Sequence, residues 1–129
     1  MTNDNMKQIL LIFISFLLLV PQAAAQNSHY LNKAKSYQRQ AEYYQKKAEG
    51  YRNEAEYYLK KAESWQREAA YYVKKGDLDR AETYTRYAEE AVDDYETQLR
   101  YATEADEKAA MYLRWAAQSL ESSQKSLSL

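Results

Sequence analysis

The sequence predicts an all-α protein: a long antiparallel hairpin of two helices, a coiled coil with alanine and aromatic heptads, which follows a cleaved signal peptide. Three observations predict this fold. The 129 residues include two Gly and one Pro, too few for the turns of an all-β or α/β fold. In the first half of the chain, alanine recurs at every seventh residue, and an aromatic residue stands three positions after each alanine. One Gly-Asp step interrupts the pattern.

The N-terminal segment is typical of a secretory signal peptide. Residues 9–20 form an apolar run that follows Lys7 and precedes Pro21 and three alanines. A positive start, a short apolar stretch and small residues at a cleavage site define such a signal. The run is too short to cross the roughly 30 Å hydrocarbon core of a bilayer. We expect cleavage after Ala25, with residues 1–25 as the signal, Met1 or Met6 as the start, and a mature chain that is secreted or periplasmic.

The first helix is expected from about residue 28 to residue 75. Its a positions are Ala34, Ala41, Ala48, Ala55, Ala62 and Ala69, and its d positions are Tyr37, Tyr44, Tyr51, Tyr58, Trp65 and Tyr72. Six heptads of this kind are a strong coiled-coil signal. Two lysines suit the C-terminus of this helix, Gly76 can adopt the left-handed conformation after it, and Asp77 can cap the next helix. We therefore place the turn at residues 76–77.

The second helix is expected from about residue 78 to residue 122, with residues 123–129 as a frayed tail. Because a two-residue turn joins arms of nearly equal length, we expect them to pair antiparallel. The second arm has its own heptads, and seven of the twelve opposed core layers then set one aromatic ring against one alanine. Two examples are Ala41 opposite Tyr112 and Ala69 opposite Tyr84. Such layers fill space without voids or clashes.

The two arms carry opposite charge. Residues 26–76 have 11 basic and 6 acidic side chains, whereas residues 77–129 have 6 basic and 12 acidic side chains. This pattern favours pairing of one arm with the other over pairing of identical arms. The net charge of −1 and the pI of about 5.9 argue against a nucleic-acid partner.

Six aromatic residues fall outside the expected core. They occupy c positions of the first helix and g positions of the second, namely Tyr43, Tyr57, Tyr71, Tyr87, Tyr101 and Trp115. These positions share one flank of the hairpin, so we expect three rungs: Tyr43 with Trp115, Tyr57 with Tyr101, and Tyr71 with Tyr87. The opposite flank is expected to carry an exposed aliphatic strip of Leu59, Val73, Val92, Leu99, Leu113 and Leu120.

The sequence offers no pattern suited to catalysis. It has no Cys, and its one histidine, His29, stands alone near the mature N-terminus. Glu89, Glu90, Asp93 and Asp94 form an acidic cluster, which we interpret as a solvated face because the core positions carry no acidic residue. We therefore expect no catalytic residue, no cofactor, no metal and, after signal cleavage, no membrane span.

Residues 62–95 resemble a single tetratricopeptide hairpin. Trp65, Ala69, Tyr72, Ala81 and Ala88 have the spacing of that family's small and aromatic positions, and residues 76–81 stand at the turn between its helices. The resemblance implies a helical hairpin that binds another protein. The alanine-rich core is also similar to the alanine zippers of bacterial envelope proteins.

Two apolar flanks exceed what a soluble monomer usually exposes. Tyr and Trp are common anchors of protein interfaces, and the simplest partner is another copy of the chain. We therefore expect a non-enzymatic structural protein that self-associates, into a filament or an envelope assembly. One alternative is a periplasmic adaptor of the tetratricopeptide kind that binds another envelope protein. Another is a carbohydrate or cell-wall binder that stacks sugars on the Tyr/Trp ladder.

Overall fold

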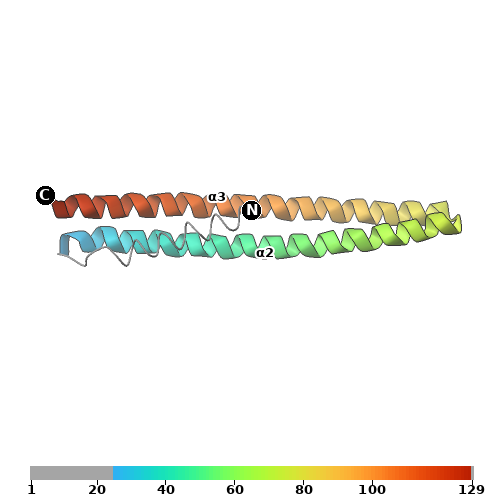
Figure 1. Cartoon of the computed structure of the whole chain (residues 1–129), viewed down its shortest axis with the longest axis horizontal. Helices are drawn as coiled ribbons and strands as arrows, with labels where there is room; N and C mark the ends of the chain where they lie inside the picture. The colour runs from blue at the N-terminus through green and yellow to red at the C-terminus, as the bar shows by residue number, and fades with distance from the viewer. Residues whose placement is uncertain (1–24, 129) are drawn as a thin grey trace. The chain divides into compact units, whose positions relative to one another are not determined.

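The computed structural model describes residues 25–128, which form two α-helices that pack against each other and are joined by a tight turn (Figure 1). Helix α2 spans Ala25–Lys75 and helix α3 spans Leu78–Ser128. No strand occurs among these residues. The predicted all-α helical hairpin is therefore confirmed. The predicted signal peptide lies, apart from Ala25, outside the described residues.

The chain divides into two compact units, each with a segment of α2 against a segment of α3. Residues 47–104 form the first, which contains the turn and is called the turn unit below. The second, called the terminal unit, comprises the described residues 25–46 and 105–128. Each unit is described by itself.

The turn has the hydrogen bonds of a Schellman motif followed by an N-cap. The amide of Gly76 donates to the carbonyl of Val73 at 3.1 Å, and the amide of Asp77 donates to the carbonyl of Tyr72 at 3.0 Å. Gly76 has a φ of 77°, in the left-handed region that favours glycine. The Asp77 carboxylate then accepts the amide of Arg80 at 3.2 Å, which satisfies one free donor at the start of α3. Both predicted turn residues are confirmed in their roles.

The two glycines predict opposite effects of the same substitution. Gly76→Ala should destabilise the hairpin by about 1–2 kcal/mol, because a side chain disfavours the left-handed conformation. Gly50→Ala should stabilise it by about 0.5–1 kcal/mol, because Gly50 is an exposed helical residue and a Cβ there meets nothing within 4 Å. Urea unfolding at one fixed protein concentration measures both. Equal effects of the two substitutions would contradict this account of the turn.

Burial follows the predicted heptads in both units. Every alanine at an a position of α2 is buried, whereas every aromatic residue at a d position is only half-buried. The reason is side-chain length. The side chain of an alanine ends at Cβ, so the partner helix covers it. An aromatic side chain is longer, and its ring extends past the contact between the two helices into solvent. The pair of helices thus encloses its alanines and leaves part of each ring uncovered.

Contacts between rings show the register in each unit. In the terminal unit, the Tyr112 ring lies 6.2 Å from that of Tyr37 and 5.7 Å from that of Tyr44, which places it beside Ala41. In the turn unit, the Tyr84 ring lies 5.4 Å from each of Trp65 and Tyr72, which places it beside Ala69. The predicted layers of Ala41 with Tyr112 and of Ala69 with Tyr84 are consistent with these contacts.

The end of α3 differs from the prediction. The helix continues to Ser128, although the sequence predicted an end near residue 122 and a frayed tail. Residues 123–128 contain neither Gly nor Pro, and Ser123 continues the heptad at a buried a position. The serine-rich composition suggested a tail, but it does not stop a helix that is already packed. At the other end, α2 begins at Ala25 rather than near residue 28.

Part of the expected exposed aliphatic strip is buried. Leu113 and Leu120 belong to a hydrophobic cluster with Ala34, Ala41 and Ala116, and Leu31 packs against it. Their predicted exposure is wrong because, in the terminal unit, these e-position side chains pack with the buried alanines and with Leu31. In the turn unit, by contrast, Leu59, Val73 and Leu99 are exposed and Val92 is partly exposed.

Candidate functional site: the aromatic face

The six aromatic side chains outside the core are all exposed, as predicted. We call this set the aromatic face. Tyr43, Tyr57 and Tyr71 have between 52% and 57% of their surface exposed, and Tyr87, Tyr101 and Trp115 between 39% and 41%. Tyr43 and Trp115 belong to the terminal unit, and the other four belong to the turn unit.

The three predicted rungs pair the wrong rings. Rings at the g positions of α3 contact d-position rings of α2 rather than its c-position tyrosines: Trp115 with Tyr37 at 5.6 Å, Tyr101 with Tyr51 at 5.4 Å, and Tyr87 with Trp65 at 5.4 Å. A g side chain lies beside the seam and reaches the facing d position. A c position lies farther around the helix, away from the partner helix. Its ring therefore contacts the next d-position ring of its own helix instead of a ring of α3.

The terminal unit contains a cluster of five rings. The Tyr112 ring stacks on that of Tyr44, with 11° between their planes, and meets the Trp115 ring edge-on at 5.3 Å. Tyr37 contacts both Tyr112 and Trp115. Tyr43 joins through Tyr44 at 5.1 Å. Two exposed rings of the aromatic face, Tyr43 and Trp115, are therefore held in place by three half-buried ones.

The turn unit repeats this cluster. The Tyr84 ring stacks on that of Tyr72 with 3° between planes and on that of Trp65 with 26° between planes. Tyr87 contacts Trp65 and Tyr84, and Tyr71 joins through Tyr72 at 5.2 Å. Each member stands four heptads along the sequence from its counterpart in the terminal unit. We did not predict these five-ring clusters, although the repeated spacing of the tyrosines was visible in the sequence.

Between these two clusters in sequence lies an incomplete third one. Tyr51 contacts Tyr101 at 5.4 Å, and Tyr57 contacts Tyr58 at 5.3 Å. The position equivalent to Tyr84 and Tyr112 is occupied by Gln98, which is half-buried. The central stacking ring is therefore missing here, and two separate ring pairs replace one continuous cluster.

Cations from the same chain lie over several of the exposed rings. Lys61 lies 5.9 Å from the centre of the Tyr57 ring, Lys75 lies 5.5 Å from that of Tyr71, and Arg100 lies 5.9 Å from that of Tyr101. The half-buried rings have similar neighbours: Lys33 over Tyr37, Arg80 over Tyr72 and Lys108 over Tyr44. At exposed sites such contacts contribute about 0.5–1 kcal/mol each. The aromatic face therefore presents rings and basic groups together.

A groove of about 360 Å³ opens beside the terminal cluster. Tyr30, Lys33 and Tyr37 of α2 and Trp115, Gln118, Ser119 and Ser122 of α3 line it. It combines ring surfaces with amide, hydroxyl and ammonium groups.

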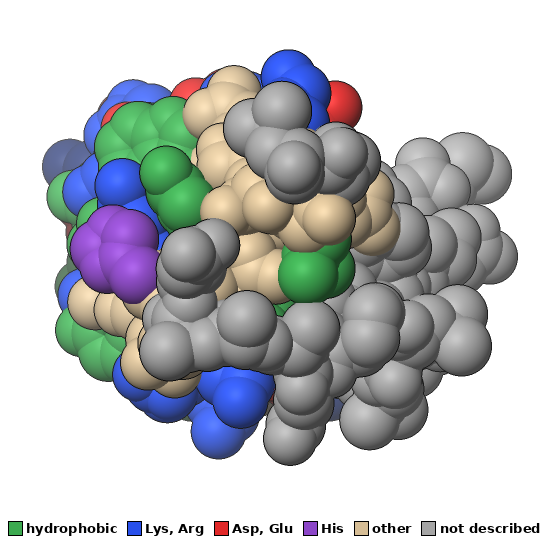
Figure 2. Space-filling view, turned by 90° about the vertical axis from the view of Figure 1, so that its left-hand side faces the viewer, with side chains coloured by type: hydrophobic (Ala, Val, Ile, Leu, Met, Phe, Trp, Pro, Cys, Tyr) green, Lys and Arg blue, Asp and Glu red, His purple; other side chains and the backbone are tan. Residues whose placement is uncertain are grey.

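Figure 2 views the end of the molecule at the left of Figure 1, where basic side chains lie next to hydrophobic ones and the single histidine is at the surface. The His29 ring meets that of Tyr30 at 5.3 Å.

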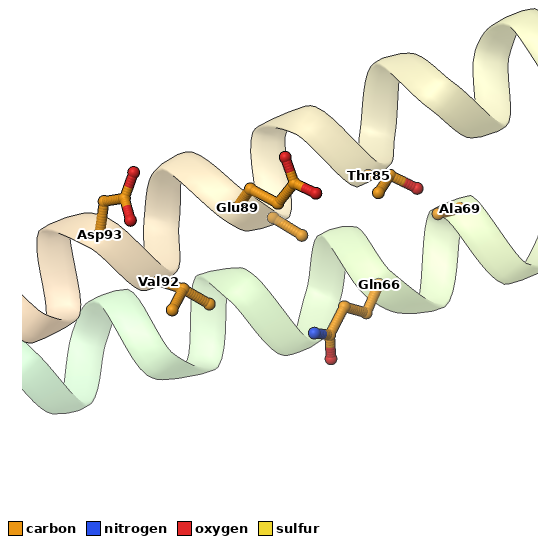
Figure 3. A pocket seen from close by; sticks show the side chains of 7 residues that line it. Gln66, Ala69, Thr85, Glu89, Val92 and Asp93 are labelled. Atoms are coloured by element: carbon orange, nitrogen blue, oxygen red, sulfur yellow. The ribbon is translucent and has the colours of Figure 1, made fainter.

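A second groove, of about 410 Å³, lies in the turn unit on the flank of the aliphatic residues (Figure 3). Gln66 and Ala69 of α2 face Thr85, Ala88, Glu89, Val92 and Asp93 of α3 across it. In Figure 3 the Val92 side chain points toward α2, and the carboxylates of Glu89 and Asp93 stand on the α3 side. Two of the four residues of the predicted acidic cluster thus border an apolar groove.

The described residues contain no group of three or more potential metal ligands. Along residues 25–128, neither helix has a stretch long and apolar enough to cross a membrane. Comparisons with models of protein families, with curated proteins and with solved structures found no match to this chain. The tetratricopeptide resemblance therefore stays a prediction.

Proposed function

We propose that the protein is an exported, non-enzymatic structural protein whose hairpins self-associate through the aromatic face. The observation that carries this proposal is the exposure of six rings, each 39% or more, that are anchored by half-buried rings beneath them. Anchored rings lose little side-chain entropy when a partner covers them. Exposed apolar surface of this extent favours association in water.

The chemistry of the aromatic face suits a protein partner. Tyr, Trp and Arg are the residue types most enriched among those that dominate binding energy, and the face combines all three. A second copy of the chain is the partner best matched to it, because the four-heptad spacing of the two five-ring clusters recurs in every copy. A cluster of one copy can therefore meet a cluster of another copy.

Sedimentation velocity over a wide concentration range tests this proposal. The 129 residues have a mass of 15.2 kDa, and we expect the sedimentation coefficient of the protein to rise as its concentration is raised. High salt should preserve the contact, since burial of rings is not screened by ions. A single species with the mass of one chain at every concentration would overturn the proposal.

The terminal groove supports a second candidate, the binding of a saccharide. Tyr37 and Trp115 supply ring surfaces, and Gln118 supplies an amide that can hydrogen-bond sugar hydroxyls. If this function is correct, soluble cell-wall oligosaccharides should shift the fluorescence of Trp115, and Trp65→Phe should preserve the shift. A titration without any change in emission would contradict this second candidate.

A further inference from the structure

We infer that the groove of the turn unit receives Leu59 and Lys60 of a second copy, which creates a second self-contact on the flank opposite the aromatic face. This inference rests on the self-association proposed above and names an additional surface for it. Three features of the turn unit carry it: the apolar lining of the groove, the unpaired acidic groups at its edge, and the complementary segment on the same flank.

The interior of the groove is suited to an apolar side chain. Ala69, Ala88 and Val92 contribute methyl groups to it. Thr85 brings a hydroxyl, but that hydroxyl already donates to the carbonyl of Ala81 at 2.8 Å. Apart from the Gln66 amide, the lining therefore offers few polar groups that an occupant would have to satisfy. A volume of about 410 Å³ exceeds the space that one leucine side chain needs.

The edge of the groove is acidic and lacks a basic partner. Glu89 and Asp93 stand one turn apart on α3, both exposed, and neither forms an ion pair with any residue between 25 and 128. Like charges at this spacing repel and weaken a helix slightly. A cation that approaches the groove from outside would remove this repulsion. The groove thus favours an occupant with an apolar side chain next to a basic one.

The turn unit itself carries such a segment. Leu59 is an exposed e-position residue one heptad from Gln66, so it lies on the same flank as the groove. Lys60 follows it and forms an exposed pair with Glu56 at 3.1 Å, an interaction weak enough to be exchanged. Leu59 thus offers the apolar group, and Lys60 offers the ammonium that Glu89 lacks.

A two-fold rotation satisfies both copies at once. Because groove and segment share one flank, a two-fold axis that lies in the plane of that flank, parallel to the helices, sets each Leu59 over the Val92 end of the other copy's groove. The same rotation places α2 of one copy against α3 of the other, which matches the basic and acidic arms.

Two contacts on opposite flanks have a consequence for the assembly. Each two-fold contact alone produces a dimer and stops. When both contacts form, each copy binds one neighbour through its aromatic face and another neighbour through its groove. Because the two contacts lie on opposite flanks, copies add in a row that does not close into a ring. The inference therefore predicts open-ended growth, whereas the aromatic face alone predicts dimers.

Charge reversal at the groove tests this inference on protein produced from the full chain. Glu89→Lys should weaken the second contact at least tenfold, because it sets Lys60 of one copy against a lysine of the other. At high concentration this variant should therefore form dimers and no larger species. Adding Lys60→Glu to Glu89→Lys should restore growth beyond the dimer. Glu121→Lys, which makes the same charge change at an exposed position of the terminal unit, should behave as the unmodified protein does.

Sedimentation velocity separates the outcomes. Dimers for Glu89→Lys, with larger species regained on Lys60→Glu, would support the groove contact. Identical behaviour of Glu89→Lys and the unmodified protein would overturn the groove contact and leave the proposed function standing. A monomeric unmodified protein at every concentration would overturn the proposed function itself, and with it the groove contact.

Discussion

Enlarging the alanine beside Tyr112 is expected to destabilise the hairpin by about 1–3 kcal/mol. Ala41 is completely buried, and the Tyr112 ring lies over it between two other tyrosines. Ala41→Leu must either push this ring outward or separate the helices, and overpacking of this kind typically costs that much. Thermal or urea unfolding at a fixed concentration measures the change.

A double-mutant cycle then tests the register. Tyr112→Ala alone should cost about 2 kcal/mol, less than for a fully buried ring. The double variant, Ala41→Leu with Tyr112→Ala, should lose at least about 0.5 kcal/mol less stability than the two single variants lose together, since the leucine fills space that the ring has left. The matched control pairs Ala41→Leu with Tyr84→Ala, which belongs to the other unit and should be additive. Additivity in both pairs would contradict the layer of Ala41 with Tyr112.

Removing three rings of the aromatic face should weaken self-association at least about a hundredfold. We expect this for the combined change of Tyr57, Tyr71 and Tyr101 to Ser, because anchoring aromatic residues at interfaces commonly contribute about 1–2 kcal/mol or more each. Each substitution also removes one contact with a neighbouring ring, so some loss of stability, about 0.5–1.5 kcal/mol per ring pair, is expected as well. Sedimentation velocity gives the association constant and far-UV circular dichroism gives the helical content.

Leu78→Ser is the matched control for that triple change. Leu78 is the most exposed large apolar residue of the described chain, at 67%, and it lies at the turn and is not one of the six rings of the aromatic face. It should leave association unchanged. If the triple variant remains helical and associates as strongly as the control, the aromatic face is not the contact surface.

The core of this protein was predictable because its period is strict. Alanine at six consecutive a positions of α2 indicates which side of that helix is buried, and the structure buries all six alanines. The turn was predictable for a similar reason. Gly76 is the residue that can take a φ of 77° without strain, and Asp77 follows it in a position to cap α3.

The flanks were less predictable because heptad position does not fix side-chain direction. Leu59 and Leu113 both occupy e positions, yet Leu59 is exposed and Leu113 is buried in a cluster that also involves Leu31. The direction of these leucine side chains depends on rotamers and neighbours rather than on period. The ring pairs failed for a different reason, which is helix geometry. The sequence spacing matched Tyr71 with Tyr87, but a ring at a g position of α3 reaches a d position of α2, and Tyr87 therefore contacts Trp65.

Radical footprinting of the tyrosines, read by mass spectrometry at low and at high protein concentration, tests the central claim most directly. If hairpins associate through the aromatic face, oxidation of Tyr43, Tyr57, Tyr71, Tyr87 and Tyr101 should fall at high concentration, and that of Leu78 should not. Equal oxidation of these five tyrosines at both concentrations, in samples whose mass shows association, would mean that the copies meet elsewhere and would contradict the account.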